Sequence, residues 1–441
     1  MKRLLPLLLC AVLALFCATT AQAAGVSITL TASEYALHYA FDAGAQDPFV
    51  ILEYATPAEK GWMMLYSEDG HFEGDVSLAY SGAGGKTSVA LTSARTTGSI
   101  GKASTTLPKA ADYQKPTGKS NAKVMDFVLT ETPEGFHYAF NAIGTDYMLL
   151  YWRSKEQTVT QPVYPDENGH YEGDVVSELT FARTQFTVQV KSGSGSMKKE
   201  ATVRKGYQAP EAPQRQEGRL SGVTVCIDAG HQENGRFVNE PIGPGLSGST
   251  SGKGGMAQGT KTNRRESIVC LEIGMLLRDE LLRQGANVVM TREDQTTFHT
   301  NIERCEIAEA GGAQIMLRLH CNNSSNHSKR GIQVYGPLNS DYAKAVADAD
   351  TYREMGQKLL DAMKTRVGMT LAKSTGMVRL NDNYVGNNWA KMMCFLVEMG
   401  YLSNPAEEYL LVTPVYQQWL AEGMADGVYE IAVARGWVQA Q

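Results

Sequence analysis

The stretch VTVCIDAGHQENG, residues 223–235, decides the fold of the carboxyl-terminal half of the chain. Residues 223–227 are apolar, rich in β-branched side chains and too few for a helix, so they predict a buried strand. Gly230 permits a sharp turn directly after this strand. His231 then lies at the carboxyl end of the strand, where α/β sheets bind their ligands. The alternative is that His231 only caps a loop. Which interpretation holds depends on the other side chains that reach the same edge of the sheet.

The sequence around this stretch alternates between strands and helices from residue 219 to the end. This order predicts an α/β domain with a largely parallel sheet flanked by helices. Apolar residues at helical spacing predict a helix within 264–285, which Gly285 ends. The other expected elements are a strand at 286–292, a helix at 301–312, a strand at 314–319 and a strand at 392–397.

Three side chains are expected to meet at the carboxyl edge of this sheet. Glu266 lies in the first turn of the helix that follows the first strand, although a helix dipole alone also favours an acidic residue there. His320 ends the strand at 314–319, just as His231 ends the first one. Two histidines and a carboxylate are a typical ligand set for a zinc ion that activates water. His299 and His327 compete for this role, but both lie in polar loops and are interpreted as solvent-facing or at the substrate rim.

Glu398 directly follows the apolar strand at 392–397 and precedes a glycine turn. Solvation alone does not explain a carboxylate in that position. Beside a metal ion, such a group can accept a proton from water and donate it to a leaving amine.

Taken together, five segments resemble the zinc-dependent N-acetylmuramoyl-L-alanine amidases, which cleave peptidoglycan. They are DAGHQ (228–232), Glu266, TRED (291–294), NIERCEIAEAGGAQIMLRLHCN (301–322) and FLVEMGYLSN (395–404). The resemblance covers residues 219–441. Two residues of the first motif depart from the family, Ala229 and Gln232, and His231 and Glu266 are 35 residues apart (266 − 231), which exceeds the spacing of compact members.

The resemblance implies roles for individual residues. It makes His231, Glu266 and His320 the ligands of one Zn²⁺ per catalytic domain and Glu398 the catalytic acid and base. It also places Arg304 and Asn322 near the substrate.

The implied activity is cleavage, by zinc-activated water, of the amide bond between the lactyl group of N-acetylmuramic acid and the L-alanine of the stem peptide. One alternative is a wall-binding protein whose amidase domain is inactive or secondary. Another is a different zinc amide hydrolase, a peptidase or a deacetylase, although the sequence lacks the H-E-x-x-H motif of helix-based peptidases.

The amino terminus has the pattern of a secretory signal peptide, expected over residues 1–23. Lys2 and Arg3 precede an apolar run at 4–16, and Ala21-Gln22-Ala23 supplies a cleavage site of small residues. The run is short for a membrane span, which needs about 20 apolar residues, although an uncleaved anchor is the alternative. We therefore expect a secreted, cell-wall-associated protein whose partner is peptidoglycan, with no stable membrane insertion after cleavage.

Charge and cysteine content argue against a nucleic-acid-binding protein and against a disulfide-rich scaffold. The net charge of −6 does not favour nucleic acid as a partner. Two of the seven cysteines lie in the predicted signal peptide. The other five are odd in number and lie in apolar runs, which is typical of buried hydrophobic residues and not of a disulfide framework.

An internal repeat occupies the first half of the chain. LHYAFDA (37–43) recurs as FHYAFNA (136–142), and GHFEGDV (70–76) recurs as GHYEGDV (169–175), both at an offset of 99 residues. The units are rich in Val, Thr, Tyr and Phe with turn residues between short alternating stretches, which predicts two tandem antiparallel β-sandwich modules. Their expected bounds are 24–112 and 121–207, followed by a linker at 208–218 and the catalytic domain at 219–441. The histidines that recur with the repeat are interpreted as structural.

Overall fold

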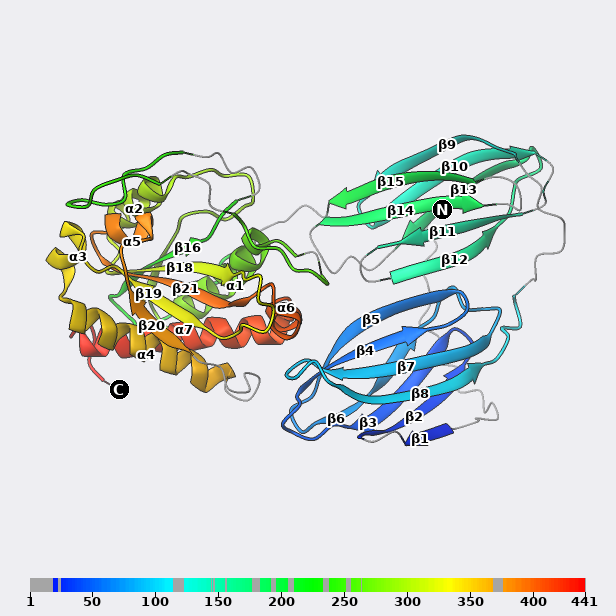
Figure 1. Cartoon of the computed structure of the whole chain (residues 1–441), viewed down its shortest axis with the longest axis horizontal. Helices are drawn as coiled ribbons and strands as arrows, with labels where there is room; N and C mark the ends of the chain where they lie inside the picture. The colour runs from blue at the N-terminus through cyan, green and yellow to red at the C-terminus, as the bar shows by residue number, and fades with distance from the viewer. Residues whose placement is uncertain are drawn as a thin grey trace.

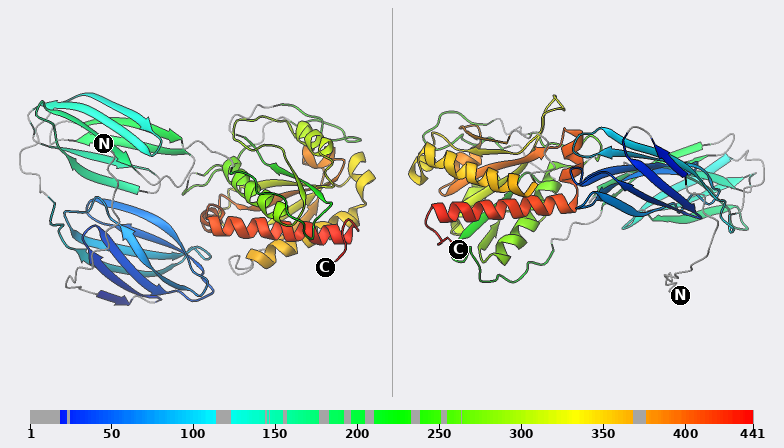
Figure 2. Two further views of the ribbon diagram at one scale, coloured as in Figure 1. Left: turned by 180° about the vertical axis from the view of Figure 1, so that it is seen from behind. Right: turned by 90° about the horizontal axis from the view of Figure 1, so that it is seen from below.

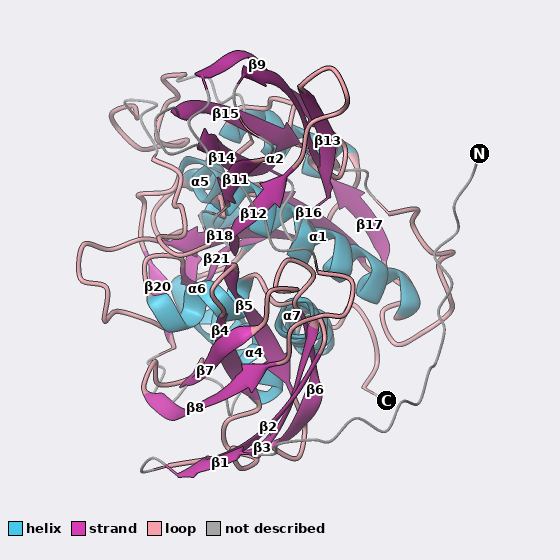
Figure 3. Ribbon diagram, turned by 90° about the vertical axis from the view of Figure 1, so that its right-hand side faces the viewer, coloured by secondary structure: helices cyan, strands magenta, loops and turns pink. Residues whose placement is uncertain are grey.

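The computed structural model of the chain has an all-strand amino-terminal half and an α/β carboxyl-terminal half (Figure 1). It describes residues 19–22, 25–113, 123–143, 145, 147–154, 157–176, 183–191, 196–204, 210–232, 238–250, 255–262, 264–367 and 376–440. Most of the predicted signal peptide therefore lies outside the described residues. Among these residues, every helix belongs to the carboxyl-terminal half (Figure 3), and none is long and apolar enough to cross a membrane.

The strands of the first half follow one order in both repeats. β1 (Thr19–Gln22) lies within the predicted signal peptide and has no counterpart in the second repeat. The first repeat contains β2 (Ser27–Ser33), β3 (Ala36–Asp42), β4 (Phe49–Ala55), β5 (Glu59–Tyr66), β6 (His71–Ser77), β7 (Gly85–Ser93) and β8 (Ser99–Leu107). The second contains β9 (Lys123–Thr132), β10 (Gly135–Ile143), β11 (Met148–Arg153), β12 (Gln157–Val163), β13 (His170–Val176), β14 (Arg183–Lys191) and β15 (Ser196–Arg204).

Two antiparallel sheets pack face to face in each repeat because every second side chain of a strand points to the same side. In β3, for example, Leu37, Tyr39 and Phe41 are buried, whereas His38 is partly exposed. The core of the first repeat joins residues of β2, β3 and β6 to residues of β4, β5, β7 and β8, and the second repeat is built in the same way. The antiparallel sheets predicted for the first half are therefore present.

One sheet runs through both repeats, which the sequence did not indicate. Its eight strands have the order β15-β14-β11-β12-β5-β4-β7-β8, with β12 and β5 as the junction. Gln157, Thr158 and Val159 of β12 pair with Gly61, Lys60 and Glu59 of β5. Glu59 is buried and accepts a hydrogen bond from the side chain of Gln157 at 3.2 Å. The two modules are therefore joined edge to edge.

The carboxyl-terminal half forms a six-stranded sheet with helices on both faces. Its elements are β16 (Thr224–Ala229), α1 (Glu266–Arg283), β17 (Asn287–Met290), α2 (Asn301–Ala310), β18 (Ile315–Asn322), β19 (Gln333–Gly336), α3 (Asp341–Val346), α4 (Ala349–Val367), β20 (Met377–Leu380), α5 (Val385–Trp389), β21 (Met393–Tyr401), α6 (Pro405–Leu411) and α7 (Pro414–Ala434).

This sheet is mixed but largely parallel, as expected. The strand order is β17-β16-β18-β21-β19-β20, and four of the five pairings are parallel. β19 runs antiparallel to β21 because β18 continues into a loop that returns along the sheet to β19 without a crossover helix. α1, α4 and α7 belong to the main core on one face, and α2 and α5 cover the other. The five cysteines that the structure describes are free, and they are buried as expected.

The first repeat packs on the helices of the carboxyl-terminal domain. Phe49 of β4 lies 5.5 Å from Trp419 and 6.3 Å from Tyr416, ring centre to ring centre, and both partners belong to α7. Trp62 of β5 lies 4.9 Å from Tyr409 of α6. The amino-terminal end of α7 abuts the first repeat in both views of Figure 2. The hydrophobic core of the carboxyl-terminal domain therefore extends onto the outer face of the first repeat.

Candidate metal centre and active site

The candidate site begins at the turn that follows β16. The sequence predicted the sharp turn at Gly230. In the structure it is His231 that adopts the left-handed conformation, with a φ of 57°. Gly230 is required for another reason. A Cβ atom at this position would lie 2.4 Å from the carbonyl oxygen of Leu319 and 2.6 Å from the His320 ring. The missing side chain lets the two histidines approach each other, and their ring centres are 4.8 Å apart.

Glu266 lies between these histidines as the first residue of α1. Its Oε1 is 3.1 Å from His231 Nε2 and 2.9 Å from His320 Nδ1, and it also accepts a hydrogen bond from the backbone N–H of Cys321 at 3.0 Å. Its Oε2 accepts a hydrogen bond from the backbone N–H of Ala257 at 2.7 Å. The carboxylate is only 3 % exposed, so these contacts hold it in one orientation.

His231, Glu266 and His320 offer one ligand atom each, and the three atoms lie within 4.8 Å of one another. Two imidazole nitrogens and one carboxylate oxygen are a suitable donor set for a transition-metal cation. Burial opposes ionisation of Glu266, but the hydrogen bonds from both histidines hold the pKa of its carboxyl well below the ordinary value. Burial lowers the pKa of His320, which favours the neutral imidazole that a metal ion needs.

Glu398 lies within β21, where its Cα is paired with that of His320 in β18. Both residues had been expected to follow the ends of their strands. Instead the β18–β21 pairing continues through them to Asn322 and Tyr401, with an irregularity after His320. Burial and the charge of Glu266 raise the pKa of Glu398 to about 8. Among the described residues, its Oε2 is buried without a hydrogen-bond partner, so this oxygen is available to a ligand or a water molecule.

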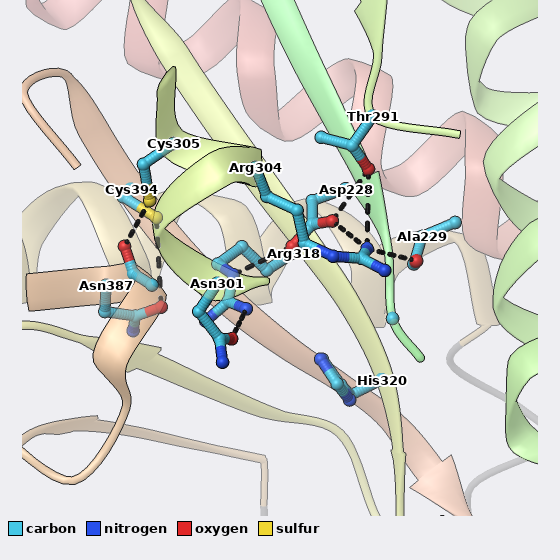
Figure 4. A network of polar contacts seen from close by, with 12 residues as sticks. Asp228, Ala229, Thr291, Asn301, Arg304, Cys305, Arg318, His320, Asn387 and Cys394 are labelled. Atoms are coloured by element: carbon cyan, nitrogen blue, oxygen red, sulfur yellow. Dashed lines mark hydrogen bonds and ion pairs between the residues drawn. The ribbon is translucent and has the colours of Figure 1, made fainter. Parts of the chain in front are cut away.

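A buried ion network supports the turn that carries His231 (Figure 4). Asp228, which is 0 % exposed, contacts the guanidinium of Arg304 and accepts hydrogen bonds from Arg318 Nε at 2.9 Å and Thr291 Oγ1 at 2.8 Å. Although burial opposes ionisation, the two arginines hold the pKa of Asp228 far below the ordinary value. The charge is therefore compensated inside the protein.

Arg304 donates hydrogen bonds through all three of its guanidinium nitrogens to backbone carbonyl groups around the His231 turn. Nη1 donates to the carbonyl of Ala229 at 2.9 Å, Nη2 to the carbonyl of His231 at 3.2 Å, and Nε to the carbonyl of His299 at 3.2 Å. Arg292 adds hydrogen bonds to the carbonyls of Ala229 and Gly230, each at 2.8 Å. Arg304 borders the cavity, and its contacts give it a positioning role for the His231 turn.

A cavity of about 810 Å³ opens over the three candidate ligands. Glu398, Arg304 and Asn322 line it together with them, so all six residues predicted for the site border one cavity. The side-chain N–H of Asn322 donates a hydrogen bond to Gln333 at 3.1 Å. His299 lies at the cavity wall, whereas His327 is exposed and lies away from it.

The long loop between β16 and α1 also borders this cavity, through Glu240, Thr250, Met256 and Ala257. Buried carboxylates fix two parts of it. Glu240 accepts hydrogen bonds from the backbone N–H groups of Asn301 and Ile302 at the start of α2. Glu408 of α6 accepts them from the backbone N–H groups of residues 260–262. The described parts of the loop therefore form a fixed wall.

The sequence-based reasoning assigned no role to Asp228, Arg292 or Arg318, which shape the turn. The sequence did contain a signal for a buried ion pair. Asp228 and Arg318 each interrupt an apolar strand segment, and charged residues are rarely buried unless they are paired. The two segments also pair directly in the sheet, with Asp228 opposite Arg318.

A His-Glu-His group at a sheet edge, beside a buried carboxyl with a raised pKa, is typical of metal-dependent hydrolases. Comparison with known families narrows this class. Residues 225–430 match the family model described as N-acetylmuramoyl-L-alanine amidase. The match confirms the resemblance of residues 219–441 and supports N-acetylmuramoyl-L-alanine amidase activity.

Individual relatives match the same half of the chain. A germination-specific N-acetylmuramoyl-L-alanine amidase from Bacillus subtilis is 25% identical over 230 residues, which are 49% of this chain and 83% of the relative. A probable cell wall amidase, LytH, from Staphylococcus aureus is 26% identical over 218 residues, 48% of this chain and 60% of the relative. The crystal structure of an N-acetylmuramoyl-L-alanine amidase from Clostridium difficile has 24% identity and a TM-score of 0.38, with 48% of this chain and 96% of that chain covered.

Proposed function

We propose that this protein is an exported, zinc-dependent peptidoglycan amidase. It cleaves the amide bond between the lactyl group of N-acetylmuramic acid and the L-alanine of the stem peptide. The observation that carries the proposal is the convergence of His231 Nε2, His320 Nδ1 and Glu266 Oε1 in one cavity with Glu398, within a segment that matches the amidase family. The predicted signal peptide at 1–23 supports action outside the cytoplasm.

The donor set fits zinc. Zinc prefers nitrogen and oxygen ligands in tetrahedral sites, and a catalytic zinc site has three protein ligands and one open position. His231, Glu266 and His320 border the cavity, so they would hold the ion where a substrate can reach it. Bound zinc supplies Lewis-acid chemistry, in which it lowers the pKa of a water molecule to about 7 and polarises a carbonyl oxygen.

The residues of the chain provide the remaining functions. Glu398 Oε2 accepts the proton of the attacking water and donates it to the nitrogen of the departing L-alanine, because its raised pKa favours proton uptake near neutral pH. The hydrogen bonds from Cys321 and Ala257 fix the Glu266 carboxylate, and Arg292 and Arg304 fix the backbone next to His231. Supporting contacts of this kind keep ligands in the productive geometry.

Product analysis tests the proposal directly. Purified peptidoglycan is incubated with the full-length protein, with and without a chelator and with zinc restored, and the products are identified by mass spectrometry. The expected products are stem peptides with a free L-alanine amino terminus and glycan strands with free lactyl groups, formed only when metal is present. Cleavage inside the stem peptide would indicate a peptidase, and loss of acetyl groups alone would indicate a deacetylase.

A further inference from the structure

The first repeat carries a groove of about 600 Å³ on the outer face of the shared sheet, away from the candidate active site. Three exposed lysines from three strands line it: Lys60 of β5, Lys86 of β7 and Lys102 of β8. The exposed Ser88 also lines it. The groove therefore offers cationic groups together with a hydroxyl group.

The charge of this groove is opposite to that of the chain, whose net charge is −6. Within the part of the chain that the structure describes, no carboxylate forms an ion pair with Lys60, Lys86 or Lys102, and Glu53 is the single acidic residue that lines the groove. Three lysines and one carboxylate leave the groove with a net positive charge, which would attract an anionic ligand.

The second repeat provides an internal comparison. The pairing register aligns β5, β7 and β8 with β12, β14 and β15 at offsets of 98, 99 and 96 residues (Leu65 with Val163, Leu91 with Val190, and Lys102 opposite Ala90 with Lys198 opposite Gln189). These offsets place Thr158, Gln185 and Lys198 where the first repeat has its three lysines. The second repeat therefore keeps one of the three positive charges, and the full set belongs to the first repeat alone.

The repeat with the groove is also the one that packs on the catalytic domain. Glu53, at the groove wall, is paired in the sheet with Trp62, whose ring contacts Tyr409 of α6. In addition, Arg330, in the loop that follows β18, donates a hydrogen bond to the carbonyl of Arg95 at 3.0 Å. A polymer bound in the groove would thus be held beside the catalytic domain.

We propose that the groove formed by Lys60, Lys86 and Lys102 binds the free carboxylates of peptidoglycan stem peptides and so retains uncleaved polymer next to the catalytic domain. This inference rests on the proposed function, because it takes peptidoglycan as the substrate. Stem peptides carry carboxylates at regular intervals along the glycan, and ion pairs with exposed lysines provide modest affinity that many repeated contacts reinforce.

The test replaces the three lysines together, as Lys60→Gln, Lys86→Gln and Lys102→Gln, in the full-length chain. Cosedimentation with purified peptidoglycan, stripped of secondary polymers, measures binding. We expect binding about tenfold weaker than that of the wild type, since each exposed ion pair contributes modestly and three are lost together. Slower release of products from intact sacculi is expected as well, with unchanged turnover of a short soluble muramyl peptide, which reaches the active site without the groove.

The matched control removes the same charge from the second repeat, as Arg153→Gln, Lys191→Gln and Lys198→Gln, and should leave binding within twofold of the wild type. Unchanged binding of the lysine variant, or equal losses in both variants, would overturn the proposal. So would undiminished binding of the wild type to peptidoglycan whose carboxyl groups have been converted to amides, or binding only to wall that retains phosphate polymers. If the wild type bound stripped wall through the lysines but released no stem peptides, the proposed function would fail while the groove assignment would stand.

Discussion

Asp228→Asn tests the buried ion network behind the candidate site. The substitution keeps the shape of the side chain but removes its charge, and it leaves Arg304 and Arg318 buried without their shared counterion. Breaking a buried ion pair in this way costs about 3–5 kcal/mol. For a domain of 150–250 residues, each kcal/mol lowers Tm by roughly 2–4 °C, so we expect a decrease of roughly 6–20 °C for the carboxyl-terminal domain.

Differential scanning calorimetry of the full-length protein measures this change. Asp279→Asn is the matched control, because Asp279 forms a 2.8 Å ion pair with Arg278 Nε but is 28 % exposed. Its loss should cost less than about 1 kcal/mol. A decrease in Tm of less than 2 °C for the Asp228 variant, or an equal decrease for the control, would refute the reasoning.

The same network predicts a pH dependence. The pKa of Asp228 is lowered in the folded protein, so its contribution to stability is complete above the ordinary pKa of 3.8. This contribution decreases as the pH falls below that value towards the lowered pKa. In acid titrations, the wild type should therefore lose the stability advantage that it has over Asp228→Asn at neutral pH. An advantage that stayed constant from pH 7 to pH 2 would contradict this assignment.

Four further changes probe the site and its surroundings. Glu266→Ala should lose metal and activity together, and a full zinc content in this variant by atomic emission would remove Glu266 from the ligand set. Glu398→Gln cannot transfer a proton, so turnover should fall by about 10²–10⁴ with unchanged zinc content, whereas activity within a few fold of the wild type would require another base. Replacing residues 243–255 by a short Ser/Gly bridge, which keeps the Ala257 hydrogen bond to Glu266, should leave zinc bound but slow the cleavage of intact sacculi, because this loop borders the cavity, and an unchanged rate would show that the wall has no role in polymer cleavage. Trp419→Ala should weaken the packing of the first repeat by about 3 kcal/mol, and unchanged hydrogen exchange in β4 would argue against a fixed docking.

β16, α1, β17, α2, β18 and β21, and the meeting of His231, Glu266 and His320, could be predicted because they depend on local patterns. Short apolar runs marked the strands, and parallel strands bring their carboxyl ends to the same edge. No strand was expected at β19, which has only four residues, so its antiparallel direction was not predicted either. The function of Gly230 was also inaccessible, because it depends on a neighbouring strand that lies about 90 residues away in the sequence.

The contacts of the first repeat with the carboxyl-terminal domain and with the second repeat could not be predicted from the sequence either. The alternation within the repeats predicts two faces for every strand, but not that Phe49 and Trp62 face another domain. Edge pairing between β5 and β12 depends on which strands are left unpaired once each module has folded. Such relations are set by long-range packing, which a single sequence does not display.

The junction of β5 with β12 has a consequence for how the repeats occur. A module on its own would present the unpaired backbone N–H and C=O groups of its edge strand, β5 or β12, to solvent, and exposed edges of this kind promote self-association. In the tandem arrangement each repeat covers this edge of the other, and the hydrogen bond from Gln157 reaches the buried Glu59. Deleting the second repeat would therefore expose the edge of β5, and the shortened protein should form dimers through this strand.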